Sequence, residues 1–231
     1  MSADDFKKMA ALAAVDFVRP EMTIGLGTGS TAAHFIAALG EKVRSGLYVS
    51  AVPTSEDTAK KAAAAGIELV EPDETTVIDL AIDGTDEVDG RKSLIKGGGG
   101  ALLREKIIAN AAKKFVVIAD ASKKVAELGA FPLPVEIDRF SFALTVRAVR
   151  EVIAAQGYAA PDVRLRALPA GPAFVSDGGN FILDCRLGRI HDAAALDRAL
   201  VAIPGVIETG LFIGIADEII LAGPGGVERI A

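Results

Sequence analysis

The sequence predicts an α/β fold: a parallel, Rossmann-like sheet with helices on both faces, plus a smaller inserted α+β domain. Three observations support this prediction. In the first half of the 231-residue chain, short apolar segments alternate with segments of helical periodicity. The apolar segments are continuous, as in parallel strands that are buried on both faces. Hydrophobic residues make up 51% of the chain and Trp is absent, a composition that suits helices packed on a sheet.

The elements of the first part follow in regular order. Residues 5–18 carry apolar side chains at helical spacing, and Arg19-Pro20 ends this helix. Thr54-Ser55 offers an N-cap for a later helix, and Gly66 ends it. Strands are expected at residues 22–26, 47–52, 67–70, 77–82 and 115–119, and further helices at 32–44, 56–65 and 101–112.

The pattern changes at Phe131-Pro132-Leu133-Pro134, where a smaller α+β unit begins. The later segment 210–220 is apolar and is expected to return to the first sheet. The predicted domains are an α/β domain of residues 1–130 plus 207–231 and a ferredoxin-like α+β domain of residues 131–206. In the small domain, strands are expected at 135–137, 163–165, 173–176 and 180–186, and helices at 144–156 and 193–203.

Charge and composition argue against several classes of protein. The 25 basic and 31 acidic residues give a net charge of −6, without the basic face that nucleic acid requires. No apolar run is long enough to span a membrane, and the acidic N-terminus is unlike a signal peptide, so a cytoplasmic protein is expected. Cys185 has no second cysteine for an internal disulfide and is expected to be a small buried residue. Two histidines and one cysteine show no metal-ligand spacing, so neither a metal nor a cofactor is expected.

Four glycines, Gly97 to Gly100, lie directly before a predicted helix. A glycine run disfavours helix and strand, whereas a loop leading into a helix N-terminus offers N–H groups and the positive end of the dipole to an anion. Lys96 adds a positive charge beside this loop. Glu105, about one turn into the helix, is electrostatically unsuited to phosphate binding, which indicates a chemical role. The alternative is a surface glutamate paired with Lys106 or Lys113.

A hydroxyl-rich turn, Gly27-Thr28-Gly29-Ser30-Thr31, joins the first strand to the next helix. It lacks Gly-Lys-Ser/Thr and is therefore not a P-loop. It fits part of the dinucleotide fingerprint, but Val52-Pro53-Thr54 stands where the required acid belongs, which argues against nicotinamide binding. The turn suits a single phosphate or sugar hydroxyls, and an ordinary turn with a Ser/Thr cap is the alternative.

Four acidic residues crowd into the loop Asp83-Gly84-Thr85-Asp86-Glu87-Val88-Asp89. A calcium loop disagrees with the positions of Gly84 and Val88, and a solvated turn is a second alternative. Asp83 directly ends an apolar strand, which indicates a constrained position. We interpret Asp83 and Asp86 as acceptors for sugar hydroxyls, and Asp83 as a group that can also shuttle a proton.

These clusters share one position in the predicted fold. Together with a fourth cluster, Asp120–Lys123, they fall at the carboxyl ends of strands, where ligands bind in open α/β sheets. Their agreement in position is a stronger signal than any single motif.

The same segments closely resemble ribose-5-phosphate isomerase of the A type, and the resemblance runs nearly end to end. The family interconverts ribose 5-phosphate and ribulose 5-phosphate without a metal. The matching segments are Gly27 to Ala32, Asp83 to Glu87, Lys96 to Gly99, Arg104 to Lys106, Ala119 to Lys123, Phe131 to Glu136 and Gly210 to Phe212.

The resemblance implies roles for individual residues. Glu105 would be the base that moves a proton between C2 and C1 through an enediolate, Asp83 would manage hydroxyl protons, and Lys96 or Lys123 would face the oxyanion. It also implies the non-oxidative pentose phosphate pathway and a homodimer, or a homotetramer, assembled with help from the small domain. The implied substrate-binding residues are Thr28, Gly29, Ser30, Thr31, Asp83, Gly84, Thr85, Asp86, Lys96, Gly97, Gly98, Gly99 and Lys123.

Two other functions fit the same architecture. A sugar-phosphate sensor would bind without turnover, but it normally needs a DNA-binding unit, for which the chain has no basic helical segment. A coenzyme-A transferase-like or sugar-phosphate deaminase-like enzyme shares the fold, so fold alone does not decide between them.

Overall fold

The structure is a computed structural model that describes residues 1–169 and 171–231. The chain forms two units: the first comprises Met1–Thr85, Arg104–Lys124 and Gly214–Ala231, and the second comprises Asp86–Leu103 and Val125–Ile213. These bounds differ from the predicted domains mainly in segment 86–103, which groups with the second unit. The segment contains two short strands that pair with each other, and one of them also pairs with a later strand of the second unit, which explains this grouping.

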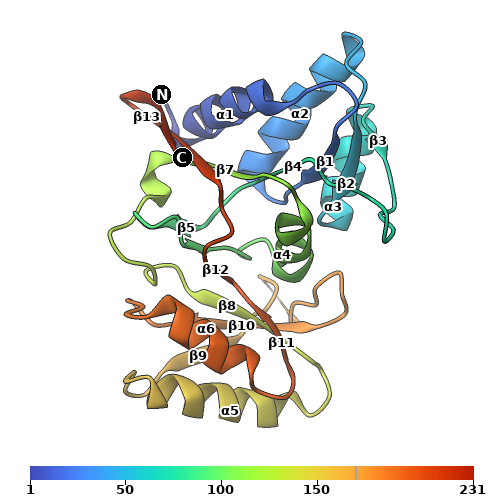
Figure 1. The fold of residues 1–231 in the computed structure, drawn as a ribbon. Helices are drawn as coiled ribbons and strands as arrows, with labels where there is room; N and C mark the ends of the chain where they lie inside the picture. Colours follow the sequence, from blue (N-terminus) through green and yellow to red (C-terminus); the bar gives the residue numbers. More distant parts are fainter. Residues whose placement is uncertain (170) are drawn as a thin grey trace. The chain divides into compact units, whose positions relative to one another are not determined.

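The first unit is built on a seven-stranded sheet of order β14-β13-β7-β4-β1-β2-β3 (Figure 1). All neighbouring strands pair in parallel except β13 and β14, which form an antiparallel hairpin at one edge. From β1 the chain moves outward to β3 and then returns to β4 on the other side, so the order switches between β1 and β4. The strands are β1 Thr23–Leu26, β2 Ser50–Pro53, β3 Glu68–Leu69, β4 Leu80–Asp83, β7 Phe115–Asp120, β13 Glu218–Gly223 and β14 Gly226–Ile230.

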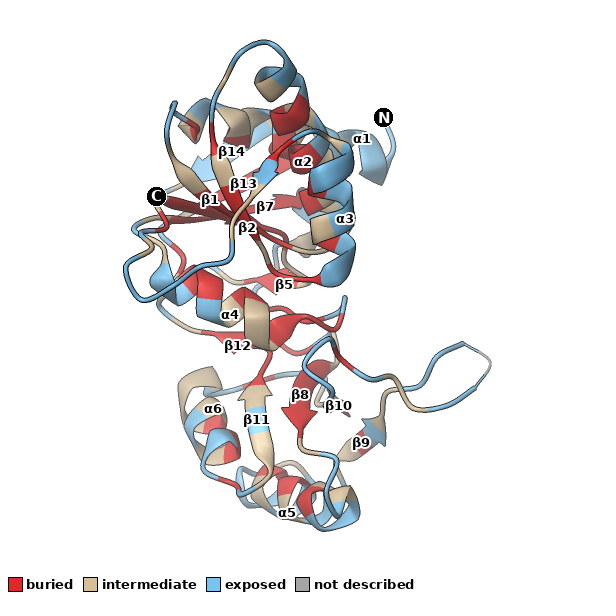
Figure 2. Ribbon diagram, turned by 90° about the vertical axis from the view of Figure 1, so that its right-hand side faces the viewer, coloured by how far each residue is buried: buried red, intermediate tan, exposed pale blue. Residues whose placement is uncertain are grey.

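Helices cover both faces of this sheet. Ile24 and Leu26 of β1 join a buried cluster with Phe35 and Leu39 of α2, and with side chains of α1 and α3. Gly25 points the other way, because a Cβ built there would meet Ile108 of α4 at 2.3 Å. Buried residues accordingly line the sheet in Figure 2. The helices are α1 Ala3–Ala14, α2 Ser30–Arg44, α3 Glu56–Ala64 and α4 Leu102–Ala111, with 3₁₀ turns η1 Val15–Phe17 and η2 Ala121–Lys123.

The second unit contains two antiparallel sheets. Helices α5 and α6 pack on the four-stranded sheet, where Val149 and Leu196 share a buried cluster with Val135 and Leu183. The sheets have the orders β11-β8-β10-β9 and β12-β6-β5. The bounds are β5 Glu87–Val88, β6 Leu94–Ile95, β8 Leu133–Ile137, α5 Phe142–Ala155, β9 Asp162–Leu165, β10 Phe181–Arg186, α6 Ala193–Val201, β11 Val206–Thr209 and β12 Leu211–Phe212.

The structure corrects several expected strands. The strand predicted at 77–82 begins only at Leu80, and Ile78 makes a single isolated bridge. Residues 173–176 are not a strand, since they contribute only isolated bridges. Segment 210–220 divides: Leu211–Phe212 pairs with β6, and the return to the first sheet begins at Glu218. Strands β5, β6 and β11 were not predicted, because the first two are two residues long and β11 carries a bulge that breaks its alternation.

Two searches of the described residues bear on the function classes. None of the helices in residues 1–169 and 171–231 combines the length and apolar character that crossing a bilayer requires. Within that same part of the chain, His, Cys, Asp and Glu side chains form no group of three or more that could hold a metal ion. Cys185 is buried, as predicted, and burial raises the pKa of its thiol.

Candidate active site

The switch between β1 and β4 places two predicted clusters side by side in the first unit. Gly27 to Thr31 follows β1 and enters α2 at Ser30, while Asp83 is the last residue of β4. Because β1 and β4 are neighbours, both clusters lie at the same carboxyl edge. Thr31 lies near Gly84, where a built Cβ would be 3.8 Å from the Thr31 Cβ. The predicted convergence of these two clusters is confirmed.

Asp83 is held by backbone amides. The residue is only 3% exposed. Its Oδ1 accepts hydrogen bonds from the N–H groups of Thr28 (3.1 Å) and Gly84 (2.7 Å). A Cβ at Gly27 would come within 2.0 Å of the same oxygen, so only glycine allows this approach. The solvated-turn alternative is therefore wrong for Asp83, whose carboxylate is fixed against the Gly27–Thr28 turn.

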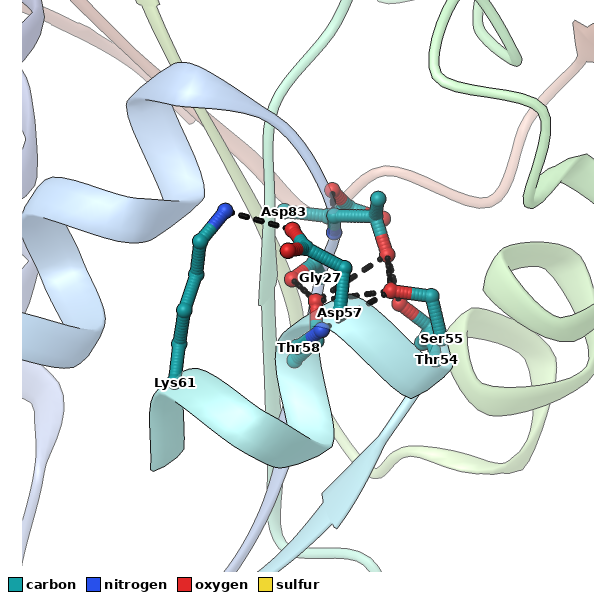
Figure 3. Close-up of polar contacts among 8 residues, drawn as sticks. Gly27, Thr54, Ser55, Asp57, Thr58, Lys61 and Asp83 are labelled. Carbon is teal, nitrogen blue, oxygen red and sulfur yellow. Dashed lines mark hydrogen bonds and ion pairs between the residues drawn. The ribbon is translucent and has the colours of Figure 1, made fainter. Parts of the chain in front are cut away.

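Four hydroxyls gather behind this turn, and the sequence indicated only part of this cluster (Figure 3). Thr28 Oγ1 lies 2.8 Å from Thr54 Oγ1, 2.8 Å from Ser55 Oγ and 3.2 Å from Thr58 Oγ1. Thr54, Ser55 and Thr58 are buried. The predicted N-cap is confirmed at Ser55, whose Oγ accepts from Thr58 N–H. The link to Thr28 joins residues about thirty positions apart, which no local pattern in the sequence reveals.

A basic residue that the sequence did not single out lies at the N-terminus of α2. Lys7 Nζ of α1 donates to Ser30 Oγ at 3.0 Å. The first turn of α2 contains no acidic residue, and the positive end of a helix dipole does not favour a cation beside it. Lysine, serine and helix N–H groups together form an environment suited to a phosphate. Lys7 lies in an amphipathic helix with no local signal of function, so only the tertiary fold brings it here.

Glu105 is a buried carboxylate in the first turn of α4. The residue is 3% exposed, which overturns the alternative of a surface glutamate. Its neighbour Arg104 instead faces outward and pairs with Glu56 of α3, with Nη1 and Oε1 3.1 Å apart. Burying a carboxylate is costly, so such a position is typical of a functional group.

Lys123 ends the 3₁₀ turn η2, which follows β7, the other neighbour of β4. Asp120 fixes this turn, since its Oδ1 accepts from Ser122 N–H at 3.1 Å. Lys124 is used differently, because its Nζ pairs with Glu228 at 2.8 Å. The predicted cluster thus lies at the carboxyl end of a strand, as expected.

Thr85 ends the first segment of the first unit, whereas the predicted residues Asp86 and Lys96 to Gly99 belong to the second unit. Lys96 is 2% exposed, and its Nζ lies 5.5 Å from the centroid of the Phe212 ring. Asp86 Oδ2 accepts from Gly98 N–H at 2.7 Å, and a Cβ at Gly98 would lie 2.6 Å from the other carboxylate oxygen. Asp86 of the acidic loop therefore contacts the glycine run, although the sequence analysis treated these two segments as separate clusters.

Arg166 supports the glycine run and was not predicted. Its Nη1 donates to the carbonyl oxygen of Gly97 at 2.8 Å. Asp184 holds the guanidinium through two hydrogen bonds, of 3.1 Å to Nε and 2.6 Å to Nη2. Such a bidentate pair fixes the arginine fork in one orientation. The second unit thus braces the loop that follows Lys96.

The fold and these residues define an α/β protein built to bind a small anionic ligand beside buried carboxylates. A sequence model of the family "Ribose 5-phosphate isomerase A (phosphoriboisomerase A)" matches residues 50–226. Ribose-5-phosphate isomerase A of Rhodopseudomonas palustris (strain BisB18) is 54% identical over 230 residues, covering 100% of this chain and 99% of the relative. That of Parvibaculum lavamentivorans gives the same identity and coverage. The chain therefore belongs to the ribose 5-phosphate isomerase A family.

Solved structures agree with this assignment. Ribose 5-phosphate isomerase A from Methanocaldococcus jannaschii has a TM-score of 0.91 at 38% identity and covers 99% of both chains. The enzyme from Plasmodium falciparum has a TM-score of 0.93 at 32% identity, with 98% of both chains covered. A D-ribose-5-phosphate isomerase in complex with phospho-erythronic acid has a TM-score of 0.92 at 37% identity, over 100% of this chain and 99% of the other.

Proposed function

We propose that this protein interconverts D-ribose 5-phosphate and D-ribulose 5-phosphate. Membership of the isomerase family supports this reaction. The observation that carries the proposal is the burial of Glu105 in the first turn of α4, directly after the glycine run. A buried carboxylate that follows a glycine run in the sequence suits proton abstraction next to a carbonyl and does not suit phosphate binding alone.

In the proposed mechanism, Glu105 takes the proton from C2 of the open-chain aldose and returns it to C1. Between these steps the substrate is an enediolate. Asp83 moves the hydroxyl proton, so that O2 becomes the new carbonyl oxygen and O1 the new hydroxyl. Lys96 stabilises the negative charge that develops on oxygen. A positioned base contributes roughly 10²–10⁴-fold, and electrostatic stabilisation of the oxyanion contributes a comparable factor.

The remaining residues are proposed to bind the substrate. Ser30, Thr31 and Lys7 at the N-terminus of α2 suit the phosphate, because they combine hydroxyls, helix N–H groups and a cation. The sugar hydroxyls are assigned to Thr28, Gly29, Asp83, Gly84, Thr85 and Asp86, with Lys96, Gly97, Gly98, Gly99 and Lys123 as further ligands. Family membership also favours the isomerase over the transferase-like and deaminase-like alternatives.

One assay tests the function directly. The protein is mixed with ribose 5-phosphate in the presence of EDTA, and ketose formation is followed. We expect ribulose 5-phosphate to accumulate to equilibrium at the same rate with and without the chelator. Absence of ketose under both conditions would refute the isomerase, whereas a rate lost only with EDTA would refute metal independence.

Location and assembly are further parts of the proposal. A role in the non-oxidative pentose phosphate pathway, a cytoplasmic location and a homodimer or homotetramer follow from the family resemblance. The small domain, residues 131–206, is proposed to take part in assembly. Light scattering measures this assembly, since a dimer has twice the 23.8 kDa of one chain.

A further inference from the structure

The hydroxyls behind the Gly27–Thr28 turn form a directed relay (Figure 3). Thr28 Oγ1 donates to Ser55 Oγ at 2.8 Å, and Ser55 Oγ donates to Thr58 Oγ1 at 3.0 Å. Thr58 Oγ1 in turn donates to the carbonyl oxygen of Gly27 at 2.9 Å. Each hydroxyl has one proton, so this order uses every donor once. The relay starts at the Thr28 hydroxyl and ends on the carbonyl oxygen of Gly27, the residue before it.

The peptide bond at the end of this relay also holds Asp83. The carbonyl of Gly27 and the N–H of Thr28 belong to one planar peptide unit. Thr58 binds the carbonyl end of that unit, while its N–H end donates to Asp83 Oδ1 at 3.1 Å. A rotation of the peptide therefore changes both hydrogen bonds together. Hydrogen bonds in such a chain also polarise and strengthen one another.

The packing leaves the peptide little room to move. A Cβ at Gly27 would be 2.0 Å from Asp83 Oδ1, and the N–H of Gly27 is bound to the carbonyl oxygen of Ile82 at 2.9 Å. Thr58 is 1% exposed, so water does not readily replace its hydroxyl. The side chain of Thr58, which lies on another element, adds a buried hydrogen bond to the peptide that holds Asp83.

We infer that Thr58 of α3 is a positioning residue, whose hydroxyl fixes the Gly27–Thr28 peptide and thereby orients the carboxylate of Asp83. This inference rests on the proposed function, in which Asp83 moves the hydroxyl proton of the sugar. Thr58 itself touches Gly27, Thr28 and Ser55. The inferred effect on the reaction is the one on Asp83, which the Gly27–Thr28 peptide holds.

The test compares Thr58→Val, which keeps the shape and removes the hydroxyl, with Thr58→Ser, which keeps the hydroxyl. We expect Thr58→Val to lower kcat by roughly 10- to 100-fold, the range expected when a reacting group is misplaced, with KM for ribose 5-phosphate nearly unchanged. Thr58→Ser should restore most of kcat. The matched control is Thr145→Val, a buried threonine of α5 in the second unit, which should leave both constants unchanged.

Amide hydrogen exchange in the protein without substrate gives a readout that does not depend on turnover. In Thr58→Val, the Thr28 amide should exchange faster than in the wild type, and in Thr58→Ser it should remain slow. Where Thr58→Val does not fold, Ser55→Gly removes the middle hydroxyl while leaving an acceptable N-cap residue. An unchanged kcat or an unchanged Thr28 exchange rate would overturn the inference. If the wild type itself lacks isomerase activity, the proposed function fails, while the exchange comparison still decides whether Thr58 holds the peptide.

Discussion

At the scale of single residues, the two proposed proton-transfer groups differ in how they are held. Asp83 receives two backbone N–H groups on one oxygen. Glu105 is buried to the same 3% exposure but lies on a helix next to the outward-facing pair of Arg104 and Glu56. Two backbone amides hold the Asp83 carboxylate in one place, which suits proton transfer between oxygens. Burial keeps bulk water away from the Glu105 carboxylate, which suits a group that takes a proton from carbon.

The first variant at this scale is Glu105→Gln, which keeps the side-chain shape and removes the basic oxygen. We expect kcat to fall by roughly 10²–10⁴-fold, while the binding of ribose 5-phosphate, measured by calorimetry, changes little. The control is Glu151→Gln, an exposed glutamate of α5 that pairs with Arg147 at 3.8 Å. Turnover within a factor of about two of the wild type would remove Glu105 from the reaction.

At the scale of elements, the sequence predicted those helices and strands that have a local signal in the sequence. Apart from β13 and β14, the helices and the strands of four or more residues in the first unit were found within a few positions, because apolar segments, Gly66 and the Ser55 cap are local signals. The two-residue strands β5 and β6 carry no such signal. Lys7 beside Ser30, Thr58 beside Gly27 and Arg166 beside Gly97 depend on tertiary packing, so they could not be predicted. The candidate site was predicted where motifs follow strands and missed where support comes from other elements.

One prediction concerns how elements of the first unit are joined at Asp79, just before β4. The side-chain hydrogen bond from Lys113 (2.8 Å) and then the N–H of Thr23 (3.1 Å) lower the pKa of Asp79 below its ordinary 3.8. A lowered folded-state pKa stabilises the protein above pH 3.8, and this stabilisation is lost as the pH falls through the folded-state pKa. We expect Asp79→Asn to lower the free energy of unfolding at pH 7 by about 1 kcal/mol.

Urea denaturation at pH 7 and at pH 3 checks this expectation. The difference between wild type and Asp79→Asn should shrink at the lower pH. The control is Asp57→Asn, which removes an exposed i,i+4 pair with Lys61 and should cost at most about 0.5 kcal/mol. An Asp79→Asn effect that is equal at both pH values would show that the carboxylate charge does not stabilise the fold.

At the scale of the whole molecule, the proposed ligands are divided between the two units. Thr28 to Thr31, Asp83 and Glu105 lie in the first unit, and Asp86 and Lys96 lie in the second. The two sets are close in the sequence, because the chain passes from the first unit to the second between Thr85 and Asp86 and returns between Leu103 and Arg104. A ligand that binds only the folded chain raises its free energy of unfolding.

Ribose 5-phosphate is a suitable probe for this division, because it is the substrate of the proposed function. At 100 times its Kd we expect it to raise the free energy of unfolding by about 2.7 kcal/mol. Amide exchange should slow at Thr28–Thr31 in the first unit and also at Gly97–Gly99 in the second. Lys7→Ala should weaken binding by roughly tenfold, because it removes one charged partner of the phosphate, whereas Lys8→Ala, an exposed neighbour, should leave Kd unchanged. Protection confined to the first unit would remove Lys96 to Gly99 from the proposed ligands. The oxyanion would then be stabilised by a residue of the first unit, and Lys123 is the candidate predicted from the sequence.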